Sequence, residues 1–205
     1  MTLDQICEQI LDRSPTPHRR LVAVAGPPAS GKSTLARNIA ECLTEKGEPA
    51  EVVPMDGFHL DDRLLQIDGT QNRKGAPHTF DAYGFVRLIA ALQSNAPIIF
   101  PVFDRNRESA IAGAGRVNAT CRTVIVEGNY LLLRHAPWAE LHAMWACSIA
   151  LHPSMEVLTA RLKARWADHG KPDAQSWIDT NDVPNITTVL SQSAAADITL
   201  TETPT

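Results

Sequence analysis

The stretch AGPPASGKSTLA, from Ala25 to Ala36, contains the pattern G-x-x-x-x-G-K-[ST] between Gly26 and Ser33. In this pattern, backbone N–H groups curl around the phosphates of a nucleotide and the lysine reaches the outer phosphates. The apolar run RLVAVAG precedes the stretch, and the segment KSTLARNIAECLTEKG continues from it with helical periodicity. Because a strand, a phosphate loop and a helix in this order are the context that the mechanism requires, we predict a nucleotide-binding P-loop.

Individual positions of the loop have separate predicted roles. Lys32 would neutralise the β- and γ-phosphates, Ser33 would place its hydroxyl on Mg²⁺, and Thr34 extends the helix N-terminus, whose dipole favours an anion. Pro27 and Pro28 lack N–H groups, so the residues after them must supply the cradle. The predicted nucleotide-binding residues are Gly26, Ala29, Ser30, Gly31, Lys32, Ser33 and Thr34, with Ser33 also a predicted metal ligand.

The rest of the chain repeats the alternation of strands and helices. Strands are expected over 50–55, 123–128, 147–152 and 196–200, and helices over 2–13, 81–94 and 154–170. Since these strands are apolar on both faces, they predict an α/β fold with three layers, in which helices cover both faces of a parallel sheet. We expect one domain over 1–205, with an N-terminal helix and linker at 1–19 and a small helical lid near 158–182.

Composition limits the partners. A chain of 205 residues with 44% apolar residues can form one substantial core, and its net charge of −4 disfavours a general nucleic-acid binder. The four cysteines lie far apart without zinc-site spacing, which predicts reduced thiols. The N-terminus lacks the pattern of a signal peptide, and no apolar run approaches the ~18 residues of a membrane span. We therefore expect a cytoplasmic protein with a small-molecule substrate and no membrane partner; a homodimer is compatible with the sequence.

Asp56, in the stretch PMDGFHLDD, is the best candidate for a catalytic base. It follows the second predicted strand, at the sheet edge where ligands bind in open parallel sheets. Transfer of a phosphoryl group to a hydroxyl needs a carboxylate beside that hydroxyl to accept its proton and aim it in line. The alternative is an aspartate that only starts a turn before Gly57.

Three further stretches carry candidate residues, each with a structural alternative. RKGAPHTFD (73–81) combines Arg73 and Lys74 with an aromatic residue and then enters a helix at Asp81, a good N-cap, so it is either an acceptor site or a capped loop. FPVFDRNRES (100–109) suits hydroxyl or anion binding, or forms a solvated turn. In TVIVEG (123–128), Glu127 ends a strand and could orient the waters of Mg²⁺. The candidate substrate-binding residues are His59, Arg73, Lys74, Phe80, Asp104 and Arg105.

The order of these motifs, from the phosphate loop through DGFH, RKGAPHTFD, PVFD and VEGNY, resembles the family of phosphoribulokinase, uridine kinase and bacterial pantothenate kinase. Within that family the chain is most similar to small bacterial proteins described as fructose-transport-system kinases. The resemblance implies a nucleoside-kinase-like fold and ATP-dependent, Mg²⁺-assisted transfer to an alcohol group. It implies Asp56 as the base, Asp104 as an acceptor contact and Glu127 as the acid on the metal side. The absence of a histidine from PVFDRNRES departs from uridine kinases and disfavours uridine.

The stretch TARLKARWADHGK places Arg161 and Arg165 four residues apart, on one face of a predicted helix. Such a pair can close over the phosphates and stabilise the transition state, or it can be a solvated basic face. The break at Gly170 and Pro172 could serve as a hinge, and Trp138, Trp166 and Trp177 are expected to be packing residues. The rival function is a regulatory ATPase switch with a protein partner. The chain lacks the N-K-x-D base motif of guanine switches and the Asp-Glu pair of motor ATPases.

Overall fold

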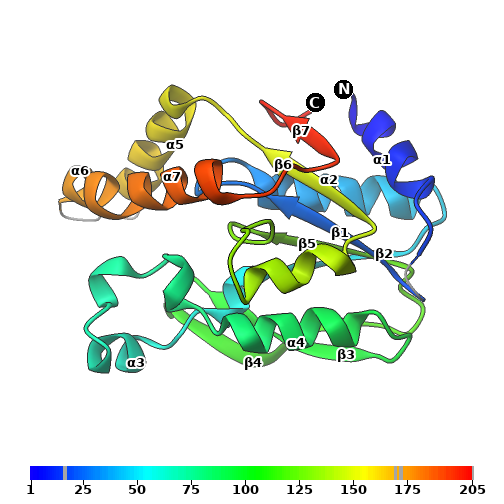
Figure 1. Ribbon diagram of the computed structural model, residues 1–205, viewed down its shortest axis with the longest axis horizontal. Coiled ribbons are helices and arrows are strands. Elements are labelled where there is room, and N and C mark those ends of the chain that lie inside the picture. The colour runs from blue at the N-terminus through cyan, green and yellow to red at the C-terminus, as the bar shows by residue number, and fades with distance from the viewer. Residues whose placement is uncertain (16–17, 169, 171–172, 205) are drawn as a thin grey trace.

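A parallel sheet forms the centre of the protein (Figure 1). The computed structural model describes residues 1–15, 18–168, 170 and 173–204. The strand order is β2-β5-β1-β6-β7, and every neighbouring pair in this sheet is parallel. The strands are β1 (Arg20–Ala25), β2 (Ala50–Pro54), β5 (Thr123–Gly128), β6 (Cys147–Leu151) and β7 (Ile198–Leu200).

Helices cover both faces of this sheet, as the three-layer prediction requires. The side chains of Leu21 and Ala23 pack on one face with α4 (Ala82–Leu92), while Val22 and Val24 pack on the other face with α1 (Leu3–Leu11) and α2 (Lys32–Glu45). This alternation follows from the two-residue period of a strand. A strand that is buried on both faces is therefore apolar throughout, which explains the sequence of β1.

Local sequence signals account for the ends of these helices. Thr2 and Gln5 form a reciprocal capping box at the start of α1, and the Asp81 carboxylate accepts the Gly84 N–H (2.8 Å) at the start of α4. The predicted strands and helices all exist, with ends that differ by one or two residues. The α/β three-layer prediction is confirmed.

The segment between β2 and β5 adds a second layer of structure that the sequence did not predict in full. An antiparallel hairpin, β3 (Ile98–Asp104) and β4 (Ser109–Val117), forms a separate two-stranded sheet beside α4. Before it come short helical turns: η1 (Met55–Phe58), α3 (Asp62–Ile67), η2 (Gln71–Arg73) and η3 (Pro77–Thr79). The alternation rule favoured parallel strands alone, whereas β3 and β4 are joined by a tight turn that only an antiparallel pair permits.

The C-terminal third forms a helical layer at one end of the sheet. After the 3₁₀ segment η4 (Trp138–Met144) and β6 come α5 (Met155–Asp168), α6 (Ala174–Trp177), the π-helical turn η5 (Ile178–Asp182) and α7 (Val183–Gln192). Leu158 and Leu162 of α5 pack with Ile178 and Ile186 in a small core of their own. In Figure 1 these helices stand opposite α3, at the end of the sheet where α2 begins.

The structure bears on two expectations from the sequence, the state of the cysteines and the presence of a membrane-spanning helix. All four cysteines are free thiols and all four are buried. None of the helices described is long and apolar enough to cross a membrane.

Candidate active site

The phosphate loop closes tightly between β1 and α2. Ala29 (φ 62°) and Gly31 (φ 97°) adopt left-handed backbone conformations, and the Ser30 N–H donates to the Pro27 carbonyl (3.1 Å). A Cβ at Gly26 would lie 2.7 Å from the Ser30 Oγ, so no side chain fits there. Successive turns of this kind direct backbone N–H groups to one point, at the N-terminus of a 14-residue helix. The loop therefore has the form of an anion cradle.

Glu127 lies directly behind this cradle, on β5. Glu127 is only 5% exposed, and this burial raises the pKa of its carboxyl group. The charge of Asp56 raises the pKa further, whereas the charge of Lys32 and a hydrogen bond with Ser33 lower it. Lys32, Ser33 and Asp56 are thus all close enough to influence one carboxylate. A serine hydroxyl and a carboxylate are hard oxygen donors of the kind that hold Mg²⁺ or its waters, so the residues present fit this ion.

Asp56 lies just beyond β2, in the turn η1, at the edge of the sheet that the sequence predicted. Its Oδ2 accepts a hydrogen bond from Arg105 Nη2 (3.1 Å), while its Oδ1 lies 4.0 Å from His59 Nε2, too far for a hydrogen bond. The turn is fixed against the hairpin, because a Cβ at Gly57 would clash with the carbonyl oxygen of Pro101 in β3. One carboxylate oxygen is therefore held, and the other is available.

Lys74 joins three segments of the wall opposite the phosphate loop. Its ammonium group contacts the carboxylates of Asp62 (2.7 Å) and Glu108 (3.2 Å) and lies 5.5 Å from the centre of the Phe103 ring. Its backbone carbonyl accepts a hydrogen bond from Asn181 Nδ2 (2.8 Å). Because only 15% of its side chain is exposed, Lys74 is a link between α3, the hairpin and the C-terminal helices rather than an unpaired cation.

His59 lies between Asp56 and two aromatic rings. Its ring centre is 4.0 Å from that of Phe80 and 4.9 Å from that of Phe103. Burial lowers the pKa of His59 to about 4, with Asp56 acting against the shift and Lys74 adding to it. The imidazole is therefore neutral near pH 7 and contributes a polar but uncharged edge to the wall.

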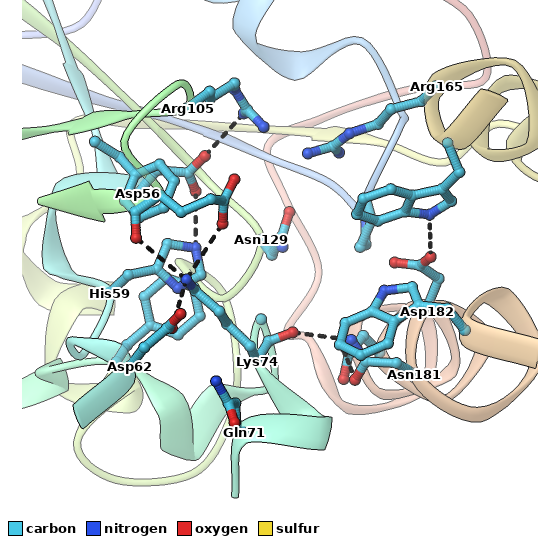
Figure 2. A pocket seen from close by; sticks show the side chains of 18 of the residues that line it. Asp56, His59, Asp62, Gln71, Lys74, Arg105, Asn129, Arg165, Asn181 and Asp182 are labelled. Carbon is cyan, nitrogen blue, oxygen red and sulfur yellow. Dashed lines mark hydrogen bonds and ion pairs between the residues drawn. The ribbon is translucent and has the colours of Figure 1, made fainter. Parts of the chain in front are cut away.

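The two arginines of α5 have different surroundings. Arg161 Nη1 donates to the carbonyls of Ser30 (2.9 Å) and Ala29 (3.3 Å), so it lies against the phosphate loop. Arg165, one turn later, points toward Arg105 across an open space in Figure 2. Burial, followed by the repulsion of Arg105, lowers the pKa of the Arg165 guanidinium. The sequence placed both arginines on one helix face, and the structure separates them into a loop contact and a residue that lines a cavity.

A cavity of about 800 Å³ connects these groups (Figure 2). That volume is within the range of ordinary ligand sites. It runs from the phosphate loop, past Asp56, to the wall formed around Lys74. Eight of the candidate residues line it: Lys32, Ser33, Asp56, His59, Lys74, Phe80, Arg105 and Arg165.

Two of the candidate substrate-binding residues, Arg73 and Asp104, do not line the cavity but contact other protein groups. Arg73 donates to the Thr180 carbonyl and to Asn185 Oδ1 (3.1 Å), so it attaches η2 to the C-terminal helices. Asp104 accepts the N–H groups of Asn106 (2.9 Å) and Arg107 (3.1 Å), which caps the turn between β3 and β4. The Asp104 contacts are those of a turn, the structural alternative given for its stretch, whereas Arg73 links two segments, and the substrate-binding roles of both residues stay predictions. The Pro172 half of the proposed hinge lies outside the described residues, and Gly170 has φ 59°.

Several lining residues escaped the sequence interpretation. The amides and carboxylates concerned are Asp62, Gln71, Asn72, Glu108, Asn129, Asn181, Asp182 and Asn185. Asp62 and Asn129 belong to stretches that were quoted for their neighbours, so they could have been included. Asn181 and Asn185 are four residues apart on the C-terminal helices, but nothing in a single sequence indicates that this helix face meets η2. Trp166 and Trp177, expected as packing residues, pack on each other (6.2 Å between ring centres) and also line the cavity.

Comparisons with known proteins give the family. No family model matches the chain. A Schizosaccharomyces pombe protein provisionally named a uridine kinase is 30% identical over 96% of this chain and 89% of its own length. The uncharacterised protein YggC of Escherichia coli is 33% identical over 89% of this chain and 78% of its own. The crystal structure of a protein from Silicibacter sp. TM1040, provisionally named a fructose transport system kinase, is 48% identical, covers 98% of this chain and 99% of its own, and superposes with a TM-score of 0.94.

The chain belongs to the phosphoribulokinase, uridine kinase and pantothenate kinase family of P-loop kinases. As a member of this family it is an ATP-dependent phosphotransferase that acts on an alcohol group. We call the end of the cavity at the phosphate loop the donor half, and we define the acceptor half as the wall around Lys74, His59 and the β3–β4 turn, where the sequence predicts the acceptor.

Proposed function

We propose that this kinase transfers the γ-phosphoryl group of MgATP to a hydroxyl of a small, uncharged, polyhydroxylated metabolite. The observation that carries the proposal is that Asp56, with one carboxylate oxygen available, lines the same cavity as Lys32 and Ser33. A hydroxyl hydrogen-bonded to that oxygen would be aimed toward the phosphate loop.

The reaction needs few protein groups. ATP supplies the phosphoryl group. Ser33 and Glu127 would hold Mg²⁺ or its waters, and the ion would neutralise charge on the phosphate oxygens. The acceptor oxygen bonds to phosphorus, the bond to the bridging oxygen breaks with its electron pair leaving on ADP, and the hydroxyl proton passes to Asp56. Lys32 and Arg165 line the cavity and are positioned to bind the phosphate oxygens.

The charges of the acceptor half support an uncharged acceptor. Lys74 is already paired with two carboxylates, Arg105 is paired with Asp56, and His59 is neutral near pH 7. A carboxylate or phosphate on the acceptor would have to compete with Asp62 and Glu108 for the same ammonium group, and it would meet their repulsion.

The uncharged polar groups of this half suit hydroxyls instead. Five amide side chains line the cavity: Gln71, Asn72, Asn129, Asn181 and Asn185. Asn181 and Asn185 are each 2% exposed and bonded to Lys74 and Arg73, so the hydroxyls of an acceptor would meet Gln71, Asn72 and Asn129, whose amides can both donate and accept a hydrogen bond. The provisional name of the Silicibacter protein makes fructose the first acceptor to test.

A panel of acceptors arranged in charged and uncharged pairs tests the proposal. ADP release would be measured with MgATP and fructose, fructose 1-phosphate, glycerol, glycerate, uridine or pantothenate, each against the rate without acceptor. We expect an uncharged polyol to raise ADP release. In the Asp56→Asn variant, MgATP binding should persist while the acceptor-dependent rate falls by ~10²–10⁴, the usual contribution of a general base.

Two outcomes would contradict the proposal in different ways. Activity with charged acceptors alone would leave the kinase assignment intact and overturn the inferred acceptor class. A chain whose ADP release responds to a protein partner and to no alcohol would be a regulatory switch.

A further inference from the structure

Arg105 occupies an unusual position between the two halves of the cavity. It is the first residue after β3, at a turn tip that the Asp104 carboxylate caps with two hydrogen bonds. One terminal nitrogen of its guanidinium group holds Asp56 Oδ2 at 3.1 Å. Its side chain is nevertheless half exposed and lines the cavity, so the remaining N–H donors are available to a ligand.

The guanidinium group of Arg105 faces that of Arg165, which comes from α5 on the other side of the cavity (Figure 2). The two cations are close enough for Arg105 to lower the pKa of Arg165, after the larger effect of burial. Asp56, Asp182 and Glu108 offset part of the repulsion between the two guanidinium groups, and an anion bound between them would offset more of it. Lys32 of the phosphate loop lines the same cavity as the two arginines.

We propose that Arg105 is a catalytic residue that binds Asp56 and the transferring phosphoryl group at the same time, opposite Arg165. This inference rests on the proposed function. The phosphoryl group moves from ADP to the acceptor oxygen that is hydrogen-bonded to Asp56, so it passes through the space between the two arginines. A planar guanidinium group can bond a carboxylate along one edge and phosphoryl oxygens along another, which an ammonium group cannot do. Arg105 thereby aligns the acceptor base with the charge that develops in the transition state.

Arg107 provides a matched control on the same turn. It is also an arginine, but its side chain is 72% exposed, its partner is Asp104, and it is absent from the cavity lining. Arg105→Met and Arg107→Met remove the same charge from positions two residues apart. Both side chains are at least half exposed, so both variants should keep a melting temperature close to that of the parent.

The decisive measurement is calorimetric affinity for MgADP with aluminium fluoride, a mimic of the transferring phosphoryl group, compared with affinity for MgATP. Groups that act in the transition state tighten binding of such a mimic more than binding of the substrate. We expect Arg105→Met to weaken binding of the mimic at least tenfold while MgATP affinity stays within about twofold. Arg105→Lys should restore little, and Arg107→Met should match the parent. With an active acceptor, kcat of Arg105→Met should fall by about 10²-fold.

The same measurement in the Asp56→Asn background separates the two roles of Arg105. If Arg105 contacts the phosphoryl group itself, Arg105→Met weakens binding of the mimic in this background too. Loss of that effect would reduce Arg105 to a partner of Asp56. Equal affinities for Arg105→Met and Arg107→Met, or a parent that binds the mimic no tighter than MgADP, would overturn the proposal. Failure of the proposed function gives a different result, the absence of acceptor-dependent ADP release by the parent.

Discussion

The donor half and the acceptor half of the cavity are built on different principles. The donor half comes from one continuous stretch, Gly26 to Thr34, whose backbone forms the cradle. The acceptor half comes from segments far apart in the chain, brought together by side chains such as Lys74, which contacts Asp62 and Glu108 and bonds to Asn181 through its carbonyl. Backbone geometry is tied to a short motif, whereas side-chain links depend on the whole fold. The phosphate site can therefore stay constant while the acceptor changes.

The largest expected effect is on the donor half alone. Lys32→Ala removes the cation nearest the outer phosphates, so MgATP affinity should fall and turnover should be lost. Calorimetry measures the first and ADP release the second. The acceptor half should be unaffected, and the melting temperature should stay near that of the parent. Unchanged MgATP affinity in a folded variant would break the assignment of the donor half.

A second prediction concerns the two lid arginines, which the structure places differently. Arg165→Ala should lower kcat by up to ~10³-fold with little change in MgATP affinity, because a contact of this kind matures in the transition state. Arg161→Ala should act mainly on the donor half, by releasing the Ala29 and Ser30 carbonyls and weakening MgATP binding. Single-turnover rates of transfer and hydrolysis, combined with binding measurements, separate the two effects. Identical behaviour of the two variants would favour a solvated basic face.

The smallest effect is expected from pH, through the acceptor half. The pKa of His59 is about 4 in the folded protein, against 6.5 for an ordinary histidine. The unfolded chain therefore binds a proton that the folded protein does not bind between pH 6.5 and 4, so stability is complete above pH 6.5 and is lost as pH falls through this window. The upper limit of the loss is about 3 kcal/mol, at 1.36 kcal/mol per pKa unit.

Denaturant unfolding of the parent and of His59→Gln, repeated across pH 4–7, measures this loss. The variant should lose less stability on acidification, because glutamine does not titrate. If the free energy of unfolding falls equally with pH in the two proteins, the His59 imidazole is more solvated than its stacking on Phe80 indicates, and the prediction is wrong.

The backbone of the donor half could be predicted almost completely from the sequence, because a glycine-rich motif between a strand and a helix determines its own conformation. The sequence also located Asp56 just after β2 and Glu127 near the end of β5, because both positions follow from apolar strands whose carboxyl ends meet at one sheet edge. The hairpin was missed because IIFPVFD contains a proline and IAGAGRV is poor in large side chains, so neither stretch reads as a strand. The partners of Arg73 and Lys74 could not be predicted, because they lie on α3, the hairpin and the C-terminal helices, and a single sequence does not show which of these surfaces meet.

The absence of a side chain at Gly57 limits how kinases of this kind can diverge. The turn that carries Asp56 lies directly on the backbone of β3 at Pro101, so the base of the hairpin cannot shift without displacing the proton acceptor. The tip, from Arg105 to Glu108, contributes Arg105 and Glu108 to the cavity, and the Lys74 ammonium group contacts both the carboxylate and the backbone carbonyl of Glu108. Natural selection can therefore exchange the tip residues that follow Arg105 to adopt a new metabolite while the geometry of phosphoryl transfer is inherited intact. A laboratory library aimed at new acceptors should vary residues 106–108 and leave Arg105 and the base of the hairpin unchanged.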